Sequence, residues 1–306
     1  MRGLVVRSVP MRIGDARRGA LLVAAAACCW SSGGLIARLV ATDPWTTSFW
    51  RGLCAATFLT GVTALRARMT GVRRPPLGWP AWAFACCTGG ASTCFLLALD
   101  RTSVANTLVV MSTGPYLAAL LAWLFLGERV RPRSWTAMTI TLAGTAVMVS
   151  GSRAAGTLPG DCLALGMAAA FAAGVVVVRA HPDVPMLPAV TLGALLASGF
   201  ALPFAHPLAV DARSLVLLAL FGVGQLSVGF LLFTAGAPLI PAAEASLIGL
   251  LETALGPLWV WLTLGEAPTA RTLVGGVLIL GATIVHAALD FVSPRADARV
   301  SSPEKI

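Results

Sequence analysis

Two stretches of the chain share one pattern. They read SVANTLVVMSTGPYLAALLAWLFLGE at residues 103–128 and PAAEASLIGLLETALGPLWVWLTLGE at residues 241–266. Aligned without a gap at an offset of 138 residues, they have eight identical positions, and the match continues through a Trp to the closing Leu-Gly-Glu. Each stretch is followed by a short polar link and an Arg, Arg133 or Arg271. Because the alignment stays in register without a gap through the Trp, the Leu-Gly-Glu and the following Arg, it indicates an internal duplication.

The composition predicts a membrane protein. Hydrophobic residues make up 57% and charged residues 11% of the 306 residues, which leaves too little polar surface to cover a soluble domain. Apolar runs of about 18 residues recur, each long enough to cross a bilayer as a helix, whereas transmembrane barrels show short alternating segments. We therefore expect an all-α, polytopic membrane protein with ten transmembrane helices, at 19–38, 46–65, 80–99, 103–125, 134–150, 162–179, 186–205, 214–235, 241–263 and 271–289.

The duplication divides these helices into two halves. Five fall in 19–150 and five in 159–289, between a basic N-terminal segment, 1–18, and a polar tail, 290–306. Because each half holds an odd number of spans, the second half enters the membrane upside down relative to the first. Two inverted five-helix repeats are a recurring plan of secondary transporters, which hold their substrate near the midplane of the bilayer.

The basic residues predict the orientation. With the N-terminus inside, the inside segments contain sixteen Arg and Lys residues and the outside links five, so both termini are predicted to be cytoplasmic. This placement between apolar runs argues against nucleic-acid binding in spite of the net charge of +9. The seven Cys residues lack metal-ligand spacing and are interpreted as small buried hydrophobes, so we expect neither a metal nor a cofactor.

The pattern resembles a known family. Ten helices in two halves, each closing on Leu-Gly-Glu, are similar to the drug/metabolite transporter superfamily, specifically its EamA-type permeases. The resemblance covers about residues 19–289. It includes the opening helix, which reads CWSSGG at residues 29–34, and Arg51 near the start of the second helix.

This resemblance implies a small-molecule permease of the plasma (inner) membrane, commonly an exporter of amino acids, related metabolites or drugs. Two positions depart from the family pattern. Thr253 replaces a Pro after Glu252, and Gly114 replaces an acidic residue before Pro115. The departures leave open whether both halves carry the acidic site or only one.

Two acidic residues lie inside an apolar run. Glu244 and Glu252 both fall in the span 241–263, where a carboxylate at the helix centre costs about 2.5–3.5 kcal/mol on insertion. Their separation of eight residues is near two helical turns, which places both on roughly one face as a site for a proton or a substrate amine. For Glu244 the alternative is a position at the membrane interface or in the mouth of a cavity.

Three further polar residues are candidates for binding substrate. Arg51 either attracts an anionic group such as a carboxylate or snorkels to the membrane surface. Asn106, the repeat counterpart of Glu244, and Gln225 either hydrogen-bond substrate or join neighbouring helices.

Aromatic and helix-breaking residues complete the candidate site. Trp30 and Ser31 offer an aromatic wall and a hydroxyl to a pocket, with close helix packing as the alternative. Tyr116, the only Tyr, is a candidate cavity residue or an interior filler. Pro115 and Pro257 are predicted to interrupt their helices, which frees carbonyl groups for binding.

Two acidic residues stand where apolar runs end. Glu128 and Glu266 are expected to be caps or anchors that pair with neighbouring Arg residues such as Arg129 or Arg271. They are not expected to contact substrate.

Other functional classes have less support. The chain has no H-E-x-x-H, G-x-S-x-G or Walker motif, so it is not predicted to be an enzyme, and primary active transport by this chain alone is disfavoured. A membrane-embedded enzyme would need clustered His or Asp at membrane depth, and a receptor or scaffold would have a sealed, dry interior. Within the transporter interpretation, a proton-coupled exporter and an uncoupled facilitator are both open, and a homo-oligomer is compatible with either.

Overall fold

The computed structural model describes residues 13–40, 42–70, 77–102, 104–150, 157–265 and 267–292, and these residues form helices and links without a β-strand. The first half contains α1 (Ile13–Ser31), α2 (Gly33–Leu39), α3 (Pro44–Thr70), α4 (Trp79–Arg101), α5 (Val104–Met111), α6 (Gly114–Leu126) and α7 (Pro132–Val149). The second half contains α8 (Leu158–Ala180), α9 (Leu187–Ala201), η1 (Leu202–Phe204), α10 (Ala212–Leu220), η2 (Phe221–Val228), α11 (Gly229–Gly236), η3 (Ala237–Leu239), α12 (Ala242–Gly249), α13 (Leu251–Leu264) and α14 (Ala270–Val292).

Some sequence predictions fall partly outside this description. The basic segment 1–18 is described only from residue 13, and the tail 290–306 only as far as residue 292. Glu266 and the side chain of Asn106 lie outside the described residues.

Each predicted span coincides with one helical unit in the described part of the chain, and several units consist of helices joined end to end. Eight units are long and apolar enough to cross a membrane. The units α3 and α7 are not among the eight, because α3 carries three Arg residues and α7 carries Arg133 and several Thr, which lower their mean hydropathy. The architecture of two repeats is as expected, while the count of ten crossings stays a prediction.

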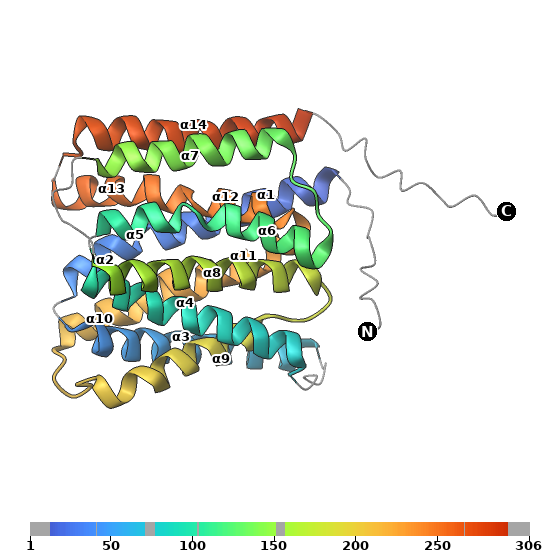
Figure 1. Ribbon diagram of the computed structural model, residues 1–306. Helices are drawn as coiled ribbons and strands as arrows, with labels where there is room; N and C mark the ends of the chain where they lie inside the picture. Colours follow the sequence, from blue (N-terminus) through green and yellow to red (C-terminus); the bar gives the residue numbers. More distant parts are fainter. Residues whose placement is uncertain are drawn as a thin grey trace.

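The helices run along one common direction and reverse at each link (Figure 1). The helix α1 begins at the end of the bundle at which α14 finishes. The links that follow α6, α8 and α11 lie at that end too, and we call it the termini end.

The outer surface of the bundle is apolar. Large hydrophobic side chains remain exposed along several helices, including Leu124 on α6, Leu262 on α13 and Val277 on α14, at 64%, 73% and 69%. Soluble proteins rarely expose continuous apolar surface of this extent. These side chains are placed to contact the lipid hydrocarbon.

Two helical units are interrupted at equivalent places in the repeat. The unit α5–α6 breaks at Ser112 and Thr113, and α12–α13 breaks at Leu250, which is Ser112 plus the offset of 138 residues. At both places, bonds between residues three apart replace the α-helical pattern, from Thr113 N–H to Val110 C=O and from Leu250 N–H to Leu247 C=O. The duplication therefore includes the break as well as the sequence pattern.

The two prolines have different places relative to these breaks. Pro115 lies in the first turn of α6, directly after its break, where its missing N–H has no helical partner to lose. Pro257 lies inside α13, seven residues after the break at Leu250, and the helix continues through it. The interruption predicted at Pro257 therefore occurs earlier in the span, where the tight turn at Leu250 separates α12 from α13.

The repeated Leu-Gly-Glu ends a helix. Gly127 and Gly265 follow the last residues of α6 and α13 with φ of 66° and 71°, a left-handed conformation that favours glycine. After α6, the N–H of Gly127 bonds to the C=O of Trp123 and the N–H of Glu128 to that of Ala122. The glycine of the motif is thus a helix cap.

The glutamate of the first motif contacts a distant element. Glu128 forms an ion pair with Arg179 at the end of α8, with 2.9 Å between Oε1 and Nε. The expected pairing with Arg129 is wrong, because the left-handed glycine turns the chain so that Glu128 faces the second half of the molecule.

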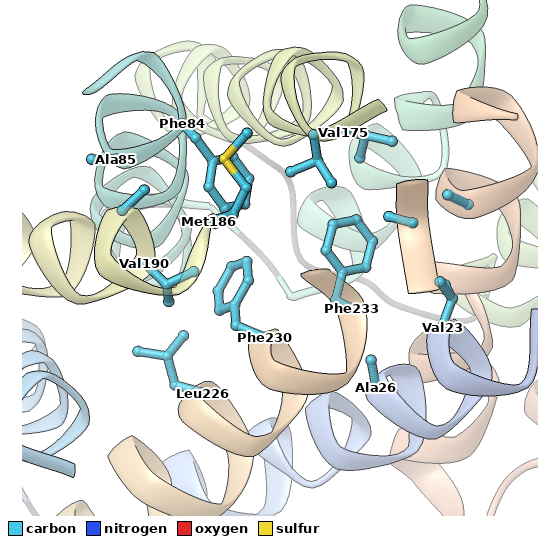
Figure 2. Close-up of a cluster of buried hydrophobic side chains, with 14 of the residues drawn as sticks. Val23, Ala26, Phe84, Ala85, Val175, Met186, Val190, Leu226, Phe230 and Phe233 are labelled. Atoms are coloured by element: carbon cyan, nitrogen blue, oxygen red, sulfur yellow. The ribbon is translucent and has the colours of Figure 1, made fainter. Parts of the chain in front are cut away.

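The largest buried cluster joins the two halves (Figure 2). In it, Phe84 of α4 packs on Phe230 of α11, which packs in turn on Phe233, and Val23 of α1 and Val175 of α8 belong to the same cluster. Helix pairs from different halves, such as α4 with α8 and α3 with α9, are in extensive contact. The repeats therefore interlock and share one core.

We expect Gly275→Ala to destabilise the protein and Gly276→Ala not to. A Cβ at Gly275 would overlap the carbonyl oxygen of Gly144 on α7 and lie 2.7 Å from the Cβ of Met148, whereas a Cβ at Gly276 meets nothing within 4 Å. Overpacking costs about 1–3 kcal/mol, against a gain in helix propensity of about 1 kcal/mol at either position. Thermal unfolding in detergent checks this; equal melting temperatures for the two variants would contradict the close approach of α7 and α14.

Candidate functional site

Arg51 lies in the interior of the protein, seven residues into α3. Its side chain is only 5% exposed, so it does not snorkel to the membrane surface. One terminal nitrogen donates to Ser92 Oγ on α4 at 3.1 Å and the other to Gln225 Oε1 on η2 at 3.0 Å. The guanidinium also lies over the ring of Phe221, 4.5 Å from its centroid. The Nε–H, equally buried, has no hydrogen-bond partner.

Gln225 holds this guanidinium from a widened helical segment. The segment η2 is π-helical, with wider turns than an α-helix, and such segments are frequent at functional sites. Gln225 accepts from Arg51 and donates through Nε2 to the carbonyl of Trp30 at 3.3 Å. It therefore connects α3 of the first half, η2 of the second half and the end of α1.

The end of α1 is a second polar contact between the halves. Ser31 donates from Oγ to the carbonyl of Cys28 at 2.6 Å and accepts from the indole N–H of Trp259 on α13 at 2.7 Å. The Trp30 ring points into the aromatic core, where its centroid lies 5.3 Å from those of Phe230 and Phe233. Trp30 thus contributes its carbonyl to the polar network and its ring to packing.

Glu252 lies two residues after the break in the ninth unit. Its side chain is half-buried, while Arg51 is buried in α3 of the other half. No hydrogen bond or ion pair joins the two side chains directly, and none reaches Glu252 from elsewhere among the described residues. The neighbouring hydroxyl of Thr253 is also buried without a partner. A carboxylate, a hydroxyl and a guanidinium N–H are therefore available to a ligand or a proton.

Two other predicted residues, Tyr116 and Glu244, lie on α6 and α12. Tyr116 turns toward α7, where its hydroxyl bonds to Thr139 Oγ1 at 3.0 Å and its ring packs on Trp135. Glu244 is buried in α12, and the break at Leu250 separates it from Glu252, so the periodicity of one continuous helix does not relate the two carboxylates.

A small pocket lies between α4, α8 and α11. Phe84, Phe171, Phe230 and Phe233 contribute to its lining, and none of the charged candidates does. The pocket belongs to the aromatic core and not to the polar network.

Sequence reasoning missed several members of the network. Ser92 and Phe221 occupy apolar spans without a distinguishing pattern, and the π-helical turn that presents Gln225 has no clear sequence signal. Trp259 could have been found, because it lies seven residues, about two helical turns, after Glu252.

The described residues contain no group of three or more His, Cys, Asp or Glu side chains that could hold a metal ion. The ionisable residues of the network are one Arg and one Glu, a pair suited to binding opposite charges. Charged groups at this depth in a membrane bundle commonly mark a pathway for a substrate or an ion.

Comparison with known proteins decides the family. The family model of the EamA-like transporter family matches residues 17–150 and again residues 158–287, which together are most of the chain. The chain belongs to the EamA-like transporter family. This EamA-family chain is accordingly a multi-pass membrane protein of a transporter family, and the match to each half agrees with the internal duplication.

A crystal structure of a protein has the same fold as this EamA-family chain. The TM-score is 0.74 at 22% sequence identity, over 89% of this chain and 98% of that chain. At this identity the likeness concerns the fold alone. No curated protein matches the chain.

We expect Gln225→Leu to reduce the stability of the EamA-family chain. The change removes one acceptor from the buried Arg51 and the donor to the Trp30 carbonyl, and a buried polar group without its partner costs about 1–3 kcal/mol. Gln225→Glu keeps an acceptor for Arg51 and is expected to cost less. Thermal unfolding in detergent measures both; a Gln225→Leu variant as stable as the wild type would contradict the role of this network.

Proposed function

We propose that the chain is a secondary transporter that exports small metabolites, such as amino acids or drug-like compounds, by alternating access between its two repeats. The observation that carries this proposal is the pair Arg51 and Glu252. They come from different halves, Arg51 is buried with its Nε–H unpartnered, and Glu252 is half-buried with no hydrogen bond to Arg51. Binding a charged substrate between them would connect the two repeats during the cycle.

The available groups indicate the chemistry of the substrate. The Nε–H of Arg51 suits an anionic group such as a carboxylate, and the carboxylate of Glu252 suits an amine or a proton. Thr253 adds a hydroxyl beside Glu252. A compound that carries both an acidic and a basic group would satisfy all three.

The break before Glu252 supports transport over a receptor or scaffold role. A static scaffold gains nothing from a helix interrupted within the membrane or from charges held there, since both lower its stability. In a transporter the break allows α12 and α13 to tilt separately. A membrane-embedded enzyme is less well supported, because among the described residues the network around Arg51 and Glu252 shows no hydroxyl hydrogen-bonded to a base.

The charge distribution supports cytoplasmic termini. Basic residues gather at the termini end, in α3, around the link after α6 and at the end of α8, namely Arg66, Arg68, Arg129, Arg131, Arg133 and Arg179. An excess of Arg in short links marks the cytoplasmic side. The chain is therefore proposed to lie in the plasma membrane with both termini inside the cell.

Retention of compounds in cells tests the proposed export. We expect cells with the protein to accumulate less of one class among a panel of amino acids and toxic analogues. Glu252→Ala should abolish the difference at equal membrane abundance, because the amine-binding carboxylate is lost. Asp100→Asn, at the exposed end of α4, is the matched control and should export normally. Equal retention across the panel, with folded protein in the membrane, would overturn the export of these compounds.

Glu252→Gln separates a proton-coupled exporter from a facilitator. If Glu252 carries the coupling proton, the variant should retain exchange of labelled for unlabelled substrate but lose its response to an imposed pH gradient, since an amide cannot bind and release a proton. Reconstituted vesicles with and without the gradient provide the measurement. An unchanged response to the gradient would assign coupling to another group or to none.

A further inference from the structure

We infer that Glu128 and Arg179 form a latch that holds the termini end of the bundle closed, and that each transport cycle breaks it. Glu128 follows α6 in the first repeat and Arg179 ends α8 in the second. Their ion pair, with Nε and Oε1 separated by 2.9 Å, therefore joins the two repeats at the termini end, where alternating access requires an opening. The inference rests on the proposed transport function.

The pair joins more than two helices. A terminal nitrogen of Arg179 donates to the carbonyl of Pro238 in η3 at 2.6 Å, and the second carboxylate oxygen of Glu128 accepts from the N–H of Ala242 at 3.4 Å. The ion pair and its hydrogen bonds thus connect the ends of α6 and α8 to η3 and to the first residue of α12. Each carboxylate oxygen has one partner, and so do two of the three guanidinium nitrogens.

A close backbone contact closes the same end beside the latch. A Cβ on Gly19 of α1 would lie 2.7 Å from the Cβ of Leu239 and 3.0 Å from the carbonyl oxygen of Gly236. A Cβ on Gly236 would lie 2.7 Å from the carbonyl oxygen of Gly19. The helix α1 therefore rests directly on η3, whose Pro238 binds Arg179. This contact leaves no room between α1 and the latch for a substrate to pass.

The exposure of the pair suits a contact that opens and closes. The side chains of Arg179 and Glu128 are 20% and 26% exposed, so water can replace each lost partner when the pair separates. A fully buried pair would leave two uncompensated charges on opening, which is strongly unfavourable. The partial exposure of the pair thus allows the latch to open without leaving buried charges uncompensated.

Accessibility of a residue behind the latch gives the first test. Ser246, one turn into α12, is 3% exposed and becomes a probe as Ser246→Cys in a background whose native cysteines are replaced by Ala or Ser. We expect Glu128→Gln to raise its labelling several-fold by an impermeant thiol reagent applied at the termini end. The charge exchange Glu128→Arg with Arg179→Glu should lower the labelling again. Arg213→Gln, at the exposed start of α10 at the other end, is the matched control and should change nothing.

Cross-linking gives the second test. In the same background without the Ser246 probe, Glu128→Cys with Arg179→Cys, joined by a short bifunctional thiol reagent, should lose transport while remaining folded. The same variant treated with a monofunctional reagent should keep transport, since its two thiols are blocked but not joined. Substrate should still reach the cross-linked protein from the opposite end, measured as binding without release.

The two tests separate the latch from the proposed function. Transport that continues at full rate through the cross-linked pair overturns the latch, as does Ser246→Cys labelling that is unchanged by Glu128→Gln. If the wild type transports nothing on the panel while labelling still rises in Glu128→Gln and falls in the charge exchange, the closure at this end is supported and the proposed substrates are wrong.

Discussion

The hydrocarbon interior of a bilayer offers no hydrogen bonds, and the rest of this structure depends on that constraint. Backbone groups must bond within the chain, so the described residues are helical through the predicted spans. Side chains that need partners must find them inside the bundle. Arg51 does so with Ser92, Gln225 and the ring of Phe221, each on a different helix or turn from Arg51 itself. The cost of burying one charge thereby fixes the relative positions of α3, α4 and η2.

The same constraint makes the incompletely satisfied groups informative. Native interiors rarely leave buried donors without a partner, because each one carries a desolvation penalty of about 1–3 kcal/mol. Arg51 Nε and Thr253 Oγ1 are such groups, and Glu252 lies beside Thr253 with no hydrogen bond of its own among the described residues. A ligand or a proton that binds these groups during part of a transport cycle would offset this penalty. Their position next to the break at Leu250 ties them to a part of the backbone that can change shape.

The sequence predicted the large features well because they follow from composition and periodicity. Apolar runs located the helical units, and the repeated stretch located the two halves. Local departures from α-helical geometry, which involve only one turn of backbone, were not predicted from the sequence. Because there is no proline at Leu250, the interruption was predicted at Pro257 instead. The π-helical segment around Gln225 was not predicted, because its amino-acid composition does not differ from that of an ordinary apolar helix. The pairing of Glu128 with Arg179 was missed for another reason: it joins residues 51 apart in the chain, and only the packing of α6 against α8 brings them together.

The half-helices α6 and α12 connect the polar interior to the termini end. α6 begins at the break at Thr113 and ends at the glycine before Glu128; α12 begins at Ala242, whose N–H bonds to Glu128, and ends at the break before Glu252. The two pack against each other, and a Cβ on Gly114 would lie 3.6 Å from Ser246 Oγ. With eight residues, α12 spans about 12 Å and reaches from the termini end to the break at Leu250. A substrate that changed the angle at Leu250 would therefore move Ala242 relative to Glu128, so that binding at the centre and closure at the termini end are coupled through one short helix.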